Sequence, residues 1–133
     1  MPMTGSLRYL ETMRSFITIL FTLGLATRSV ADPPVDYLRD VKPLLTRHCV
    51  ECHGPKEQKG KLRLDTLEAV LKGGQDGKVV EAGASAKSML VHNVAHIGDE
   101  DDYMPPPDNK DKIPPLTKEQ IGLIRAWIDQ GAK

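Results

Sequence analysis

The sequence has few of the residues that build or cross-link a large core. Its 133 residues include two cysteines, one tryptophan and two phenylalanines, and aromatic residues make up 5% of the chain. Cys49 and Cys52 are so close in sequence that a disulfide between them would not link distant segments. The length and composition therefore predict one small domain that needs a metal or a cofactor to complete its core.

The chain also lacks an apolar run long enough to span a membrane. Its one candidate, residues 16–26, falls short of the roughly 20 apolar residues that a spanning helix needs. Two arginines precede this run and the small residues 29–31 follow it, which is the pattern of a cleaved secretory signal. We therefore expect residues 1–31 to be a signal peptide and residues 32–133 to be the mature domain, periplasmic or otherwise exported, with no membrane span.

The chain has no excess of charge of either sign. Lysine plus arginine and aspartate plus glutamate number 18 each, and removing residues 1–31 changes the formal net charge from +0 to −2. Nucleic acids and anionic membrane surfaces select strongly basic faces. The charge balance therefore argues against either as a partner.

The apolar periodicity predicts helices separated by long loops, and no stretch alternates as a strand would. We expect a first helix within residues 35–48, kinked near Pro43, with an apolar face of Tyr37, Leu38, Val41, Leu44 and Leu45. We expect three more: one after Asp65 that ends at Gly73, one over residues 86–96, and one after Thr117 that ends at Gly131.

Local signals specify these later helices further. Asp65 with Glu68, and Thr117 with Gln120, have the spacing of capping boxes. The third helix has an apolar stripe, with two histidines on its opposite, solvent-facing side; the stripe is Leu90, Val94 and Ile97, and the histidines are His92 and His96. The last helix has one apolar arc, formed by Ile121, Leu123, Ile124, Trp127 and Ile128.

Both cysteines lie in the stretch HCVECHGP, where His53 directly follows Cys52. A Cys-x-x-Cys-His run is the attachment signature of c-type haem. One helical turn would present both thiols to the porphyrin edge, and His53 would reach the iron as proximal ligand. Haem attachment of this type takes place outside the cytoplasm, which agrees with the export signal, and we predict one covalent haem c.

Three other uses of the cysteine pair remain as alternatives. A thioredoxin-like dithiol needs a βαβ context, which the helical pattern lacks. A zinc site would need His92 and His96 to join Cys49 and Cys52, across a gap longer than a usual finger loop. A disulfide would close too small a loop to stabilise much.

A haem in an electron carrier usually has a second axial ligand, and methionine there raises the reduction potential. After residue 31 the methionines are Met89 and Met104. Met104 precedes three prolines, which would stiffen its loop and hold a weak thioether ligand in place. We predict Met104 as the distal ligand, with Met89, His92 and His96 as alternatives.

The segment that follows the motif predicts part of the haem pocket. Leu62 and Leu64 could line the pocket, and Arg63 could pair with a haem propionate or be an ordinary solvated arginine. A backbone carbonyl near residues 60–62 is the expected acceptor for His53 Nδ1–H, because ligating histidines usually have such a partner.

These motifs resemble the planctomycete-type cytochrome c domain, a branch of the class I cytochrome c fold. The matching pieces lie in the family's order and cover most of residues 41–132; they are VKPLLTRHCVECHGP, KGKLRLDTLEAVLKGG, SMLVHNVAH, YMPPP and LTKEQIGLIRAWIDQGA. The resemblance implies an all-α fold of about four short helices with long loops wrapped around one covalent haem. It also implies that the first and last helices cross at the face formed by Leu123, Ile124, Trp127 and Ile128.

With two protein ligands on the iron, such a site carries one electron at a time and binds no substrate. The sequence therefore predicts an exported electron carrier between larger redox partner proteins, and not an enzyme. The alternatives are a five-coordinate haem enzyme or gas sensor, in which Met104 is unbound, and an electron-entry module docked to a separate enzyme.

Overall fold

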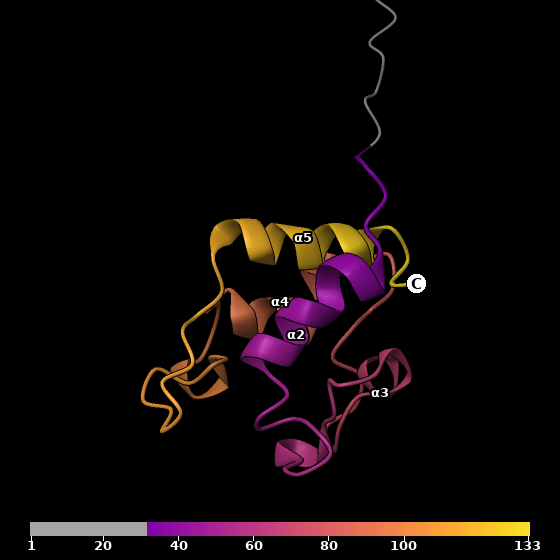
Figure 1. Cartoon of the computed structure of the whole chain (residues 1–133). Coiled ribbons are helices and arrows are strands. Elements are labelled where there is room, and N and C mark those ends of the chain that lie inside the picture. The colour runs from indigo at the N-terminus through magenta and orange to yellow at the C-terminus, as the bar shows by residue number, and fades with distance from the viewer. Residues whose placement is uncertain (1–31) are drawn as a thin grey trace, which may run out of the picture. The chain divides into compact units, whose positions relative to one another are not determined.

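The computed structural model describes residues 32–133, so the predicted signal peptide, residues 1–31, lies outside the described residues. The described residues form four α-helices and four shorter helical turns without a strand, which confirms the predicted all-α fold (Figure 1). None of the described helices has the length and apolar character that crossing a membrane requires. In chain order the elements are η1 (Tyr37–Val41), α2 (Lys42–His48), η2 (Lys59–Lys61), α3 (Leu67–Lys72), η3 (Ser85–Lys87), α4 (Met89–Val94), η4 (Glu100–Asp102) and α5 (Lys118–Asp129).

The predicted first helix forms as two pieces. η1 is a π-helical turn closed by a hydrogen bond from Lys42 N–H to the Tyr37 carbonyl, and α2 begins at Lys42. Pro43 lies in the first turn of α2, where its missing N–H leaves no hydrogen bond broken. The prolyl ring therefore ends one helical segment and starts the next, as its position predicts.

The buried face of this region differs from the predicted one at Leu38. Tyr37, Val41 and Leu45 are buried, and Leu44 packs partly against the core. Leu38 is 67% exposed. A π-helical turn changes the angle between successive side chains, so the spacing of an ideal α-helix misplaces this leucine.

α5 packs against η1, η3 and α4 and supplies the centre of the core (Figure 1). Ile124, Trp127 and Ile128 are almost fully buried, and the Trp127 ring lies 5.5 Å from the Tyr37 ring at 38°. This contact joins the N-terminal turn to the last helix, as the resemblance predicts. Leu123 is only half-buried and lies outside the core cluster.

The predicted N-terminal cap of α5 is confirmed, whereas the cap of α3 lies one residue after the predicted position. Thr117 and Gln120 form the reciprocal capping box, with hydrogen bonds of 3.3 and 2.8 Å. In α3 the cap is Thr66, whose hydroxyl accepts from Ala69 N–H. Asp65 cannot cap because its carboxylate forms an ion pair of 2.6 Å with Arg63.

The third predicted helix is shorter than expected. η3 occupies residues 85–87, and α4 itself begins at Met89. Leu90 and Val94 are buried as predicted, but Ile97 is 50% exposed. The chain leaves the helix before Ile97, because α4 ends at Val94 and His96 has a φ of 55°.

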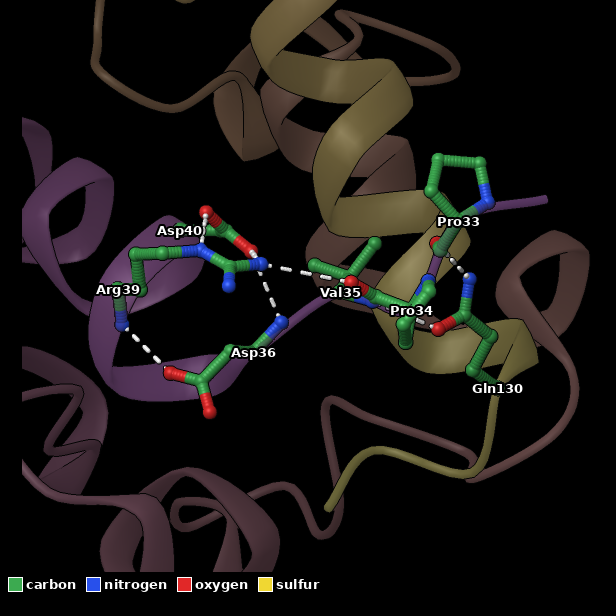
Figure 2. Close-up of polar contacts among 7 residues, drawn as sticks. All are labelled: Pro33, Pro34, Val35, Asp36, Arg39, Asp40 and Gln130. Atoms are coloured by element: carbon green, nitrogen blue, oxygen red, sulfur yellow. Dashed lines mark hydrogen bonds and ion pairs between the residues drawn. The ribbon is translucent and has the colours of Figure 1, made fainter.

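The Gln130 side chain ties the start of the described chain to the end of α5 (Figure 2). Its Nε2 donates to the Pro33 carbonyl at 3.1 Å, and its Oε1 accepts from Val35 N–H at 2.9 Å. Beyond this contact, Asp36 caps η1 by accepting from Arg39 N–H at 2.7 Å. These contacts fix the segment that precedes the first core residue, Tyr37, against the end of α5.

A second polar contact holds the other side of α5. The Asp129 carboxylate accepts from both the N–H and the Oγ–H of Ser85, each at 2.8 Å. These hydrogen bonds hold the pKa of Asp129 below its usual range, because they stabilise the ionised form. The contact fixes η3, and therefore the entry to α4, on the last helix.

Candidate haem site

A cavity of about 430 Å³ lies beside the Cys-x-x-Cys-His motif. Its volume is in the range of sites that hold small organic ligands, roughly 300–1,000 Å³. The walls come from the turn after α2, from segment 59–79, from α4 and from the loop that follows it. The leucine, valine and isoleucine side chains that line it are Leu62, Leu64, Val79, Leu90, Val94 and Ile113.

The motif forms one helical turn directly after α2. The Cys49 carbonyl accepts hydrogen bonds from Cys52 N–H at 3.2 Å and from His53 N–H at 2.9 Å. All three side chains line the cavity. The structure therefore brings together the two thiols and the imidazole that the sequence predicts for haem attachment.

His53 has one ring nitrogen fixed and one free. Its Nδ1 lies 3.0 Å from the Lys59 carbonyl, which can only accept, so Nδ1 carries the proton and donates. The acceptor lies one residue before the predicted range of 60–62. Burial lowers the pKa of His53, which favours the neutral imidazole that binds metals through Nε2.

Cys49 and Cys52 are both free thiols, and they differ in environment. Cys49 is buried and Cys52 is half-buried. Burial, with a smaller effect from Cys52, raises the pKa of Cys49 to about 12. Burial therefore favours the neutral thiol of Cys49 over the thiolate.

Met104 lines the same cavity as His53. Its side chain is half-buried, and its N–H donates to the Asn93 carbonyl at the end of α4 at 3.0 Å. Met89, an alternative ligand, also lines the cavity, but it is 50% exposed. The two methionines can therefore be compared directly by substitution.

The other alternative ligands, His92 and His96, do not line this cavity. His92 Nε2 lies 2.8 Å from the Ala86 carbonyl, and the His96 ring stacks on Tyr103 with centroids 4.5 Å apart. Both histidines are half-buried, so the expectation of two solvated surface side chains is wrong. His92 contacts the residues just before α4, and His96 contacts the residues that follow α4.

The three predicted pocket residues separate into two groups. Leu62 and Leu64 line the cavity, on the side of the His53 turn, where Leu64 N–H donates to the His53 carbonyl at 2.8 Å. Arg63 does not line it, because its guanidinium turns to the Asp65 carboxylate. The assignment of the leucines to a haem pocket stays a prediction, and the geometry gives no support to a propionate contact by Arg63.

A close approach of two backbone segments builds one wall of the cavity. Gln75 N–H donates to the Gly60 carbonyl at 2.8 Å, and a Cβ at Gly74 would lie 2.7 Å from that same oxygen. Only glycine fits at this distance. This explains the glycine at position 74, which the sequence identifies merely as part of the end of a helix.

Several polar residues that line the cavity have no role in the sequence-based prediction, among them His48, Asn93 and Asn109. His48 is buried, and its Nδ1 donates to the Pro114 carbonyl at 3.0 Å. Asn109 bonds the backbone on both sides of its own turn. The position of Asn109 in a proline-rich loop is typical of a side chain that closes a turn, and this signal could have identified it.

The zinc alternative finds no support in the structure. Within residues 32–133, no three His, Cys, Asp or Glu side chains are close enough together to hold a metal ion. The fold therefore does not bring His92 and His96 together with Cys49 and Cys52 in a metal site.

The cavity suits a haem by the chemistry of its lining. It combines two thiols, an imidazole with a free Nε2, two thioethers and a mostly apolar wall. Two buried polar atoms on residues that line it, His48 Nε2 and Asn93 Oδ1, have no hydrogen-bond partner among the described residues. Tyr37 Oη and His96 Nε2, on residues that do not line the cavity, are unpaired as well, so the donor set of the lining and not these atoms carries the match to a haem.

Comparison with known proteins agrees with this chemistry. Residues 49–108 match the family described as Planctomycete cytochrome C, while no curated protein and no solved structure matches the chain. The matched segment begins at Cys49 and includes His53 and Met104. A match to a cytochrome c family implies binding of haem c. Residues 49–108 of this chain therefore match the planctomycete cytochrome c family, the family that the sequence motifs predict.

Proposed function

We propose that this chain is an exported monohaem cytochrome c that carries single electrons between larger redox proteins. The observation that supports the proposal most strongly is the lining of one cavity by Cys49, Cys52, His53 and Met104. These residues would supply both thioether attachments and both axial ligands.

Each of these residues has a distinct role in the proposal. When bound, the haem supplies an iron centre that exchanges one electron. Cys49 and Cys52 would hold the porphyrin by their sulfur atoms. His53 would bind on the proximal side through Nε2, which the hydrogen bond of Nδ1 to the Lys59 carbonyl leaves free. Met104 would occupy the distal side.

Occupation of both axial positions explains why we propose a carrier and not an enzyme. With His53 and Met104 both bound, no position on the iron would remain open for a substrate. The apolar wall, with Leu64 and Leu90 buried in it, would exclude water and raise the reduction potential further.

Export and redox partners are also part of the proposal. Its support is the signal-like pattern of residues 1–31 together with the need for haem attachment outside the cytoplasm. A periplasmic or otherwise exported location would place the protein among other redox proteins.

The coordination is tested by adding carbon monoxide to the reduced, haem-loaded protein at neutral pH. A bound Met104 blocks the distal position, so we expect the visible spectrum to stay unchanged over minutes. An immediate spectral shift would show an open coordination position. That result would favour a five-coordinate haem enzyme or gas sensor over the carrier.

A further inference from the structure

The loop that contains Met104 is held by hydrogen bonds at several points. We define the distal loop as residues 98–115. It is attached to α4 by Met104 N–H, which donates to the Asn93 carbonyl, and to the motif turn by His48, which donates to the Pro114 carbonyl. Between these two attachments, the chain from Pro105 to Ile113 has no regular secondary structure and needs contacts of its own.

Asn109 supplies those contacts with its whole side-chain amide. Its Nδ2 donates to the Pro106 carbonyl at 2.8 Å and to the Ile113 carbonyl at 3.0 Å, and its Oδ1 accepts from Ile113 N–H at 2.7 Å. An amide of this kind has two N–H donors, so both are used. The side chain is partly buried and lines the same cavity as Met104.

The link from Asn109 to Met104 is short and stiff. Asn109 fixes the Pro106 carbonyl, and only Pro105 separates Pro106 from Met104. Each prolyl ring fixes its own φ angle, which leaves few rotations to absorb a change in the position of Pro106. Pro105 is buried, so this connection cannot move freely into solvent.

We propose that Asn109 is the positioning residue for the distal ligand: its hydrogen bonds hold the Met104 thioether against the iron. The inference rests on the proposed ligation by Met104. A thioether is a weak ligand, so its occupancy depends on how well the loop is held in the bound conformation. Loss of the Asn109 contacts would let external ligands compete with Met104 more effectively.

The test is imidazole binding to the oxidised, haem-loaded protein, compared between wild type and Asn109→Asp. The substitution keeps the size of the side chain but directs carboxylate oxygens at two carbonyl oxygens. Both hydrogen bonds from Nδ2 are lost, and this loss weakens the closed form of the loop relative to the open form. We expect imidazole to bind at least about tenfold more tightly, because the apparent affinity rises with the open fraction. The charge-transfer band between sulfur and iron should weaken in parallel.

A matched control removes the effect of charge. Asp108 is the exposed neighbour of Asn109, and the double variant Asp108→Asn with Asn109→Asp has the composition and net charge of the native chain. We expect this double variant to bind imidazole like Asn109→Asp, and Asp108→Asn alone to behave like wild type. Asn109→Ser retains one donor and one acceptor, so its imidazole affinity should lie between those of wild type and Asn109→Asp. It also provides a second variant in case Asn109→Asp fails to fold.

The outcomes separate the inference from the proposed function. Wild-type protein without the sulfur-to-iron band would overturn Met104 ligation and this inference together. Wild-type protein with the band, and imidazole affinities of Asn109→Asp and Asn109→Ser within twofold of it, would overturn the inference alone. A double variant that behaves like wild type would also overturn it, because charge and not hydrogen bonding would then explain the effect.

Discussion

Met104→Ala should open the distal side of the iron. We expect the oxidised variant to lose the sulfur-to-iron charge-transfer band and the reduced variant to bind carbon monoxide within mixing time. The reduction potential should fall by on the order of 0.1–0.3 V, a part of the roughly 0.8 V range that axial ligands span. Visible spectroscopy and a redox titration measure all three effects.

Met89→Ala is the matched control, because Met89 is the other methionine that lines the cavity. Met89 is 50% exposed and stands at the start of α4, so its removal should leave the band and the blocked distal position intact. Loss of the band in Met89→Ala, with retention in Met104→Ala, would show that Met89 and not Met104 is the distal ligand.

Trp127→Ala should cause the largest loss of stability among single core substitutions. Trp127 is 1% exposed, packs on Tyr37, and donates from its Nε1 to the Lys133 carbonyl at 2.9 Å. Removing a buried tryptophan typically costs about 3–5 kcal/mol, a large part of the roughly 5–15 kcal/mol that stabilises a small domain. Urea unfolding of the haem-loaded protein gives the free energy of unfolding.

Trp127→Phe separates packing from hydrogen bonding. Phenylalanine keeps an aromatic ring against Tyr37 and loses only part of the volume and the Nε1–H donor. We therefore expect it to cost clearly less than the alanine variant. A loss below about 1 kcal/mol for Trp127→Ala would contradict the claim that α5 and η1 form the centre of the core.

The sequence predicts the features that depend on neighbouring residues. The Cys49–His53 turn and the Thr117–Gln120 cap each involve residues a few positions apart, and the structure contains both. The prediction of a helix break near Pro43 is confirmed for the same reason. In each case one local rule decides the geometry and no competing contact opposes it.

The features that the sequence does not predict depend on competing or distant contacts. Asp65 fails as a helix cap because Arg63 takes its carboxylate. Leu38 is exposed because η1 is a π-helical turn. The hydrogen bond of His48 with Pro114 joins positions 66 residues apart, and no periodicity or motif indicates such a pair. The cavity depends on contacts of this last kind.

Covalent attachment of haem is the central claim, and it is tested most directly by acid-acetone extraction followed by the pyridine haemochrome spectrum of the exported protein. We predict that the haem stays with the chain and gives the spectrum of a haem joined through two thioethers, with one haem per chain. Haem that is extracted into the acetone, or a chain that contains zinc and no haem, would contradict the account.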